Sequence, residues 1–173
     1  MQIKKTGPVR NIVLIIVLVL LLSSCGYQLV REKGIYGGDI SSVYISVFKN
    51  MTYEPHISQY VTDAFSKELV STGLFTVNKE NSDGYLQSAI TKITTQPYSM
   101  SAVGIAIEKM VTLDVDIALY KKNGTFVKRW PISDFETYRV DNTNYEEYNK
   151  TEAIKRLSAR MARRFSAVLL VDY

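Results

Sequence analysis

Three kinds of side chain in this sequence could do chemistry: one cysteine, one histidine and a pair of aspartates. Asp114 and Asp116 alternate with apolar residues, so they share one strand face at about 6.6 Å, a spacing at which two carboxylates can hold a metal or exchange protons. His56 has no recognisable Ser or Cys partner and is expected on the surface of a first helical turn. G-x-S-x-G, P-loop and H-E-x-x-H patterns do not occur. The residues predict no enzyme and no metal site.

Cys25 is the only cysteine, which excludes an intramolecular disulfide, and its surroundings indicate another use for the thiol. Lys4, Lys5 and Arg10 precede eleven consecutive apolar residues at 12–22. This run is shorter than the roughly 20 residues that cross a bilayer, so a permanent transmembrane helix is the less favoured reading.

The tetrapeptide Leu22-Ser23-Ser24-Cys25 resembles the bacterial lipobox, which consists of an apolar residue, two small residues and a cysteine. The resemblance implies cleavage before Cys25, a diacylglycerol thioether on its sulfur and an N-acylated new terminus, with no other cofactor. Two or more acyl chains give stable anchoring. Gly26 stands where an aspartate would resemble an inner-membrane retention signal, which favours the periplasmic leaflet of the outer membrane.

The formal net charge of +4 mostly belongs to the leader, because three of its basic residues and no acidic ones lie before Cys25. The remainder, at about +1, offers no argument for nucleic-acid binding. Basic residues do gather around a predicted hairpin, where they are candidates for binding an anion such as a lipid phosphate, although a plain solvated surface is the alternative: Lys109, Lys121, Lys122, Lys128 and Arg129.

Basic residues also form a stripe on the last predicted helix. Its members lie away from the apolar arc, and Glu152 is placed to pair with Arg156 at i,i+4. The stripe comprises Arg156, Arg160, Arg163 and Arg164.

The chain is also rich in tyrosine, with 12 in 173 residues, a side chain common both at protein interfaces and in sheets. Four tyrosines fall where an exposed strand face or rim is predicted: Tyr44, Tyr98, Tyr120 and Tyr138.

Hydrophobic periodicity predicts two helices. From Ile57 apolar residues follow helical spacing to a stop near Gly73, and a longer helix runs from about Tyr145 to the C-terminus. The apolar arc of the longer helix comprises Ile154, Leu157, Met161, Phe165 and Val168.

Alternation predicts the strands, at 43–48, 74–77, 85–95 and 111–120, with a further strand from Phe126. Residues 81–84 form a turn between the second and third of them. Asn123-Gly124 is a pair preferred in two-residue type I′ hairpins, so the strand after it should pair antiparallel with the strand before it. Pro131 should interrupt that strand or place it at an edge.

This element order predicts an α+β fold, a two-layer α/β sandwich with a mostly antiparallel four- to five-stranded sheet and two helices packed on one face. The expected organisation is a signal peptide at 1–24, a lipidated N-terminus and tether at 25–41, and a single domain at 42–173.

Two segments give the mature chain a resemblance to a known family, the lipopolysaccharide-assembly lipoproteins called LptE. They are Cys25-Gly26-Tyr27-Gln28-Leu29 and residues 43–75, which contain an F-x-N-x-T-Y-E-P segment at Phe48–Pro55. The resemblance implies a lipoprotein that plugs the outer-membrane β-barrel LptD, helps it assemble, binds lipopolysaccharide and assists its delivery to the cell surface. Family positions proposed to touch lipopolysaccharide are basic, which again points to the hairpin candidates.

Two other hypotheses stay open. An anchored α/β sandwich could serve as a general envelope lipoprotein that scaffolds a secretion channel or binds peptidoglycan. An envelope enzyme would use Asp114 and Asp116.

Overall fold

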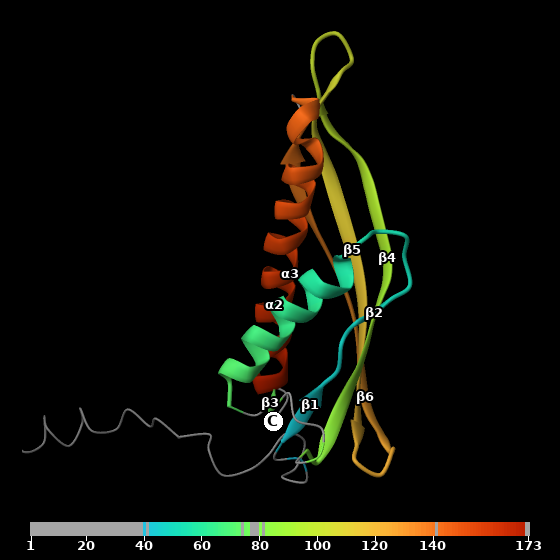
Figure 1. Ribbon diagram of the computed structural model, residues 1–173, viewed down its shortest axis with the longest axis vertical. Helices are drawn as coiled ribbons and strands as arrows, with labels where there is room; N and C mark the ends of the chain where they lie inside the picture. The colour runs from blue at the N-terminus through green and yellow to red at the C-terminus, as the bar shows by residue number, and fades with distance from the viewer. Residues whose placement is uncertain are drawn as a thin grey trace, which may run out of the picture. The chain divides into compact units, whose positions relative to one another are not determined.

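A computed structural model describes residues 40, 42–73, 75–76, 80, 82–140 and 142–171, all within one compact unit that spans residues 33–173. The predicted signal peptide, the lipobox with Cys25 and most of the tether lie outside the described residues. The elements in chain order (Figure 1) are β1 (Val43–Ile45), β2 (Lys49–Asn50), α2 (Ile57–Ser71), β3 (Phe75–Thr76), β4 (Gly84–Met100), β5 (Ala106–Lys121), β6 (Phe126–Arg139), η1 (Thr143–Tyr145) and α3 (Glu146–Val171).

Three long strands form the main part of the sheet. Strand β5 lies in the middle and pairs antiparallel with β4 on one side and β6 on the other. Its residues alternate as predicted: the odd positions from Val111 to Leu119 are buried on the face toward the helices, here called the inner face, and Thr112, Asp114 and Asp116 lie on the outer face. The α+β fold is confirmed.

The short strands pair in parallel, with β3 beside β1, and β1 and β2 beside β4. Of the predicted strand at 43–48, residues 43–45 form β1 and residues 46–48 lie in no strand; β2 begins after them, at Lys49. Phe48 stands directly before β2, and its ring enters the core. Its N–H donates to Thr62 Oγ1 at 3.0 Å and its carbonyl accepts from Ser58 Oγ at 2.5 Å, so side chains of α2 replace the strand ladder here.

The turn between β5 and β6 differs from the predicted type I′ turn. A type I′ turn needs positive φ at both central residues, but among the described non-glycine residues only His56 has a positive φ. Gly124 has φ 86°, and the Lys121 N–H donates to the Thr125 carbonyl at 2.9 Å, as in a longer loop with glycine in the left-handed region. The predicted antiparallel pairing is confirmed, and Pro131 lies in an edge strand.

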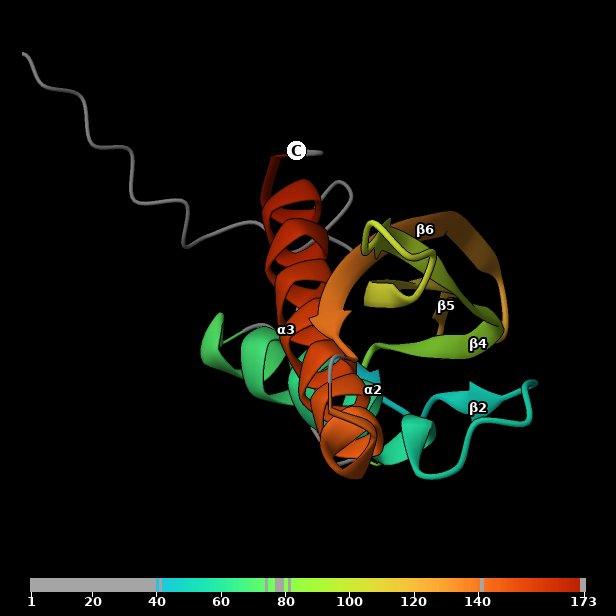
Figure 2. The ribbon, with the colours of Figure 1, turned by 90° about the horizontal axis from the view of Figure 1, so that it is seen from above.

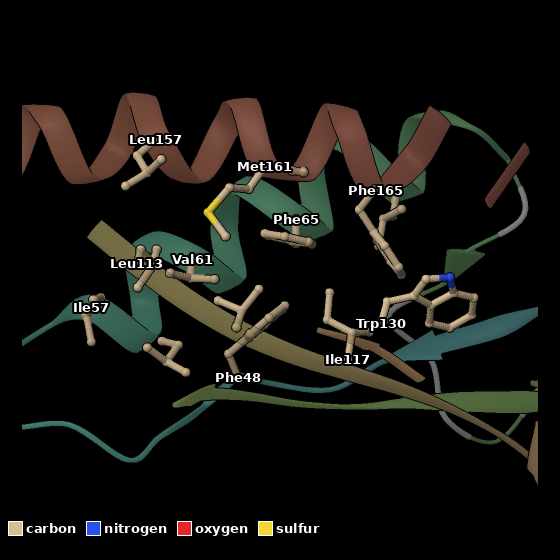
Figure 3. Packing of buried hydrophobic residues seen from close by; sticks show 14 of the residues in the cluster. Phe48, Ile57, Val61, Phe65, Leu113, Ile117, Trp130, Leu157, Met161 and Phe165 are labelled. Atoms are coloured by element: carbon tan, nitrogen blue, oxygen red, sulfur yellow. The ribbon is translucent and has the colours of Figure 1, made fainter. Parts of the chain in front are cut away.

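Both helices lie on the inner face of the sheet (Figures 1 and 2). In the core between the layers, the centre of the Phe65 ring lies 4.8 Å from that of Phe48 and 5.9 Å from that of Phe165 (Figure 3). The Trp130 ring meets the Phe165 ring edge-on, with their centres 5.4 Å apart. The predicted arc of α3 is buried except Val168, which is 45% exposed because the helical spacing continues from Phe165 to Leu169.

No helix of the described residues covers the outer face of the sheet (Figure 2). Within the same residues, no helix has the length and apolar character needed to cross a membrane.

Candidate functional site

The candidate basic residues do not form one cluster. Strand β5 carries Lys109 near its start and Lys121 at its end, and the twelve residue steps between them correspond to about 40 Å. The other three candidates lie on or after the β5–β6 turn. We call Lys121, Lys122, Lys128 and Arg129 the basic end, to which Lys109 does not belong.

Lys109 is held at the opposite end of the sheet by an ion pair. Its Nζ lies 2.5 Å from Glu146 Oε1 at the start of α3, and this hydrogen bond raises the pKa of Lys109 above its ordinary value. The pairing neutralises the charge, which makes Lys109 a poorer candidate for an anionic ligand than Lys122, whose Nζ has no ion pair among the described residues.

Arg129 and Lys128 of the basic end have side-chain partners within the chain. The Arg129 guanidinium makes a two-pronged ion pair with Asp116, which raises the pKa of Arg129. Lys128 Nζ lies 5.5 Å from the centre of the Trp130 ring, a cation–π distance.

Lys122 faces a pocket of about 600 Å³ beside the first residues of β4. Tyr44, Tyr85 and Gln87 line the pocket with it. The Lys122 backbone N–H donates to the Asp83 carbonyl at 2.7 Å, which fixes the turn against the start of β4, and its Nζ makes only a long contact of 3.4 Å with the Glu80 carbonyl. An ammonium held in this way can turn toward a phosphate or carboxylate.

A row of aromatic residues crosses four strands at this end of the outer face. In register across β1, β4, β5 and β6, the row consists of Tyr44, Tyr85, Tyr120 and Phe126. The Tyr85 and Tyr120 rings stack at 5.3 Å, and Phe126 meets Tyr120 edge-on at 5.7 Å. The sequence indicated Tyr44 and Tyr120 separately, but the register that aligns them appeared only in the fold.

The tyrosine prediction fails at one position. Tyr138 is only 4% exposed, because alternation along β6 places it on the inner face with Trp130. Burial raises the pKa of Tyr138. Tyr98 is exposed as predicted, while Tyr44 and Tyr120 are half-buried.

The two aspartates of the enzyme hypothesis are engaged separately on the outer face. Asp114 accepts a hydrogen bond from Ser133 Oγ at 2.5 Å, and Asp116 is paired with Arg129. Over the part of the chain that the structure describes, no three His, Cys, Asp or Glu residues gather in a way that could hold a metal. His56 lies exposed at the N-terminus of α2, as predicted.

The basic stripe of α3 is largely a structural contact with β6. Arg160 binds Asp134 at 2.8 Å and also Glu136, while Arg164 reaches Asp134 at 3.0 Å. Arg156 pairs with Glu136 at 3.5 Å, and Glu152 pairs with Lys155 in place of the predicted Arg156. The missed signal was the alternation of β6, which places both acids on the same inner face as Trp130.

Together the sheet and the two helices on its inner face define a small two-layer α+β protein. The model of the LptE family, described as lipopolysaccharide-assembly, matches residues 40–167, and the chain belongs to this family. The family is one of non-enzymatic lipoproteins that take part in lipopolysaccharide assembly.

Solved structures are similar to the chain at low sequence identity. A Xanthomonas campestris protein aligns with a TM-score of 0.54 and 8% identity over 81% of this chain and 86% of its own. Rare lipoprotein B from Shewanella oneidensis aligns with a TM-score of 0.45 and 15% identity over 75% of this chain and 90% of its own. Lipoprotein B from Nitrosomonas europaea aligns with a TM-score of 0.45 and 14% identity over 85% of this chain and 94% of its own. No curated protein matches the chain significantly.

Proposed function

We propose that this chain is an outer-membrane lipoprotein that plugs an LptD-like β-barrel, helps it assemble and assists the transport of lipopolysaccharide to the outer leaflet. The observation that carries the proposal is the family match over residues 40–167, which includes every described strand and most of α3.

The leader supports the membrane part of the proposal. A charged start, eleven apolar residues and the lipobox that ends at Cys25 form a lipoprotein signal. The acyl chains on Cys25 would hold the mature protein on the periplasmic leaflet without a transmembrane helix.

The uncovered outer face of the sheet supports a barrel as the partner. Polar residues such as Thr94 and Thr112 lie on this face beside the exposed Phe135. The aromatic row lies at one end of the same face. Tyrosine and phenylalanine are enriched at protein interfaces. A face of this kind suits the inner wall of a barrel better than bulk water.

The basic end is our candidate for the anionic part of the glycolipid. Lys121 and Lys122 lie on the turn beside the pocket, where they could make charge-assisted hydrogen bonds with phosphate groups. Lys109 and Arg129 stay in the candidate set from the sequence, but their ion pairs with Glu146 and Asp116 make them weaker members than Lys122.

The test is a pull-down of tagged full-length protein from detergent-solubilised outer membranes, with partners identified by mass spectrometry. Recovery of a large LptD-like barrel would support the proposal. Recovery of a secretion channel or peptidoglycan without such a barrel would instead favour a general envelope scaffold.

A matched pair of variants makes the pull-down specific to the outer face. Phe135 is 51% exposed on the outer face and Val70 is 42% exposed on α2. Phe135→Glu should reduce recovery of the barrel, whereas Val70→Glu should leave it unchanged. Equal recovery with both variants would contradict docking through the outer face.

A further inference from the structure

The turn between β4 and β5 and the strand residues beside it carry several large exposed hydrophobic side chains. Four side chains within eight residues are more than half exposed: Tyr98 59%, Met100 56%, Val103 80% and Ile105 67%. The turn extends beyond the N-terminal end of α3 (Figure 1). We call residues 98–105 the apolar tip.

Charge is excluded from this part of the chain. No Asp, Glu, Lys or Arg occurs between Lys92 and Glu108, although 22% of the whole chain is charged. Charged residues return directly behind the tip, where Glu108 accepts a hydrogen bond from Ser99 and Lys109 pairs with Glu146. Apolar side chains therefore occupy the tip itself, Tyr98 lies at its boundary, and the charged residues Glu108 and Lys109 follow behind it. This sequence of side chains matches the change from hydrocarbon to headgroups to water at a membrane surface.

Three hydrogen bonds close the backbone of the tip. The Ser101 N–H donates to the Ile105 carbonyl at 2.7 Å, the Gly104 N–H donates to the Ser101 carbonyl at 3.0 Å, and the Ile105 N–H donates to Ser101 Oγ at 3.0 Å. This closure limits the number of backbone groups that need another partner, and at a shallow depth water and headgroups can supply partners to the rest.

We propose that the apolar tip inserts into the hydrocarbon of a phospholipid membrane to a shallow depth. From Glu108 to Val103 the strand rises by at most about 16 Å, which reaches the boundary between headgroups and acyl chains. The proposal goes beyond the proposed function, because it concerns a different surface and a different partner, which the lipoprotein meets before the domain enters a barrel.

A protein partner fits the tip less well. Stable protein interfaces bury about 800 Å² on each side, which four side chains do not provide. They also use hydrogen bonds and favour Trp, Tyr and Arg as anchors, while valine is under-represented there. Hydrocarbon requires only apolar side chains and a closed backbone.

The length of the chain allows the tip and the lipid anchor to use one membrane. The tip lies at the end of β4 opposite Gly84, beside which Ile40 packs, and the sixteen residue steps of β4 correspond to about 50 Å. The fifteen steps from Cys25 to Ile40 can also span about 50 Å when extended.

The test places an environment-sensitive fluorophore at the tip of full-length lipidated protein reconstituted in vesicles of phosphatidylethanolamine and phosphatidylglycerol at 3:1. Val103→Cys provides the site, since acylation blocks Cys25, and the unsubstituted protein gives the labelling background. The matched control is Asn123→Cys, on the charged turn between β5 and β6.

A label at position 103 should show blue-shifted emission, quenching by lipid-borne nitroxides and protection from aqueous iodide, and a label at 123 should show the reverse. Adding Met100→Asp and Ile105→Asp should abolish the shift at 103 while the circular dichroism stays unchanged, because both side chains are exposed. Iodide access at 103 equal to that at 123, or a shift that persists in the double Asp variant, would overturn the proposal.

Discussion

At the scale of single residues, the most consequential contact joins α3 to the edge strand. The Asp134 side chain is only 9% exposed and accepts hydrogen bonds from Arg160 and Arg164. Arg160 also donates to Glu136 and to the Phe135 carbonyl. These bonds occupy acceptors of β6 and attach α3 to an edge that would otherwise be open to another strand.

Asp134→Asn should lower the free energy of unfolding by about 1–3 kcal/mol at pH 7, because a neutral amide cannot balance the guanidinium of Arg160. Urea denaturation measures the change. Asp63→Asn, at an exposed carboxylate of α2, is the control and should stay within about 0.5 kcal/mol of wild type. A similar loss in both variants would contradict the role of the ion pair.

The same contact predicts a pH dependence. Burial on its own would raise the pKa of Asp134, but hydrogen bonds from Arg160 and the Phe135 amide lower it below its ordinary value. An unfolded aspartate titrates near pH 3.9, so the contribution of Asp134 is complete above about pH 5 and is lost as the pH falls through the lower folded value. The stability difference between wild type and Asp134→Asn should therefore shrink below about pH 4, and a constant difference would contradict the assignment.

At the scale of elements, the contacts made by the segment Phe48–Pro55 explain why its residue types occur together. Phe48 enters the core, and Asn50 Oδ1 accepts from the Thr52 N–H at 2.8 Å while its Nδ2 donates to the Glu54 carbonyl at 3.0 Å. Glu54 then pairs with Lys150 of α3 at 2.8 Å. The segment closes a turn, starts α2 and connects it to α3.

Asn50→Ala should destabilise the domain by about 1–2 kcal/mol, because two backbone groups lose their partners. Tyr53 lies in the same turn with its side chain fully exposed, so Tyr53→Ala is the matched control and should change stability little. Chemical denaturation distinguishes the two. A larger effect at Tyr53 than at Asn50 would indicate that the turn is held differently.

Helix α2 depends on Phe65, whose ring lies between those of Phe48 and Phe165. Phe65→Ala should cost about 3–5 kcal/mol, because it leaves a cavity between the two helices. The exposed Val47→Ala is the control. A thermal melt in which both variants resemble wild type would be inconsistent with the observed packing.

At the scale of the whole domain, the two hairpin turns have opposite character. The turn between β4 and β5 is apolar and uncharged, while the turn between β5 and β6 carries Lys121 and Lys122. Because β4 and β5 run antiparallel along their whole length, the two surfaces lie at opposite ends of the sheet. One sheet therefore separates an apolar surface from a basic one.

Lys121→Gln with Lys122→Gln should weaken lipopolysaccharide binding by about tenfold and reduce its salt dependence, because two positive charges are removed from the basic end. Lys49→Gln with Lys67→Gln removes the same charge from exposed positions elsewhere. Binding of purified lipopolysaccharide to immobilised protein provides the measurement. Equal losses in the two double variants would show that net charge alone governs binding.

Features that depend on near neighbours in the chain could be predicted from the sequence. The lipobox-like tetrapeptide is contiguous, the arcs of α2 and α3 repeat every three or four residues, and the alternation of β5 repeats every two. The parallel pairing of the short strands, the partners of Arg160 and the alignment of the aromatic row across four strands emerged only from the folded domain. These depend on which distant segments meet, and their free energy comes from core packing and long-range ion pairs that no local pattern records.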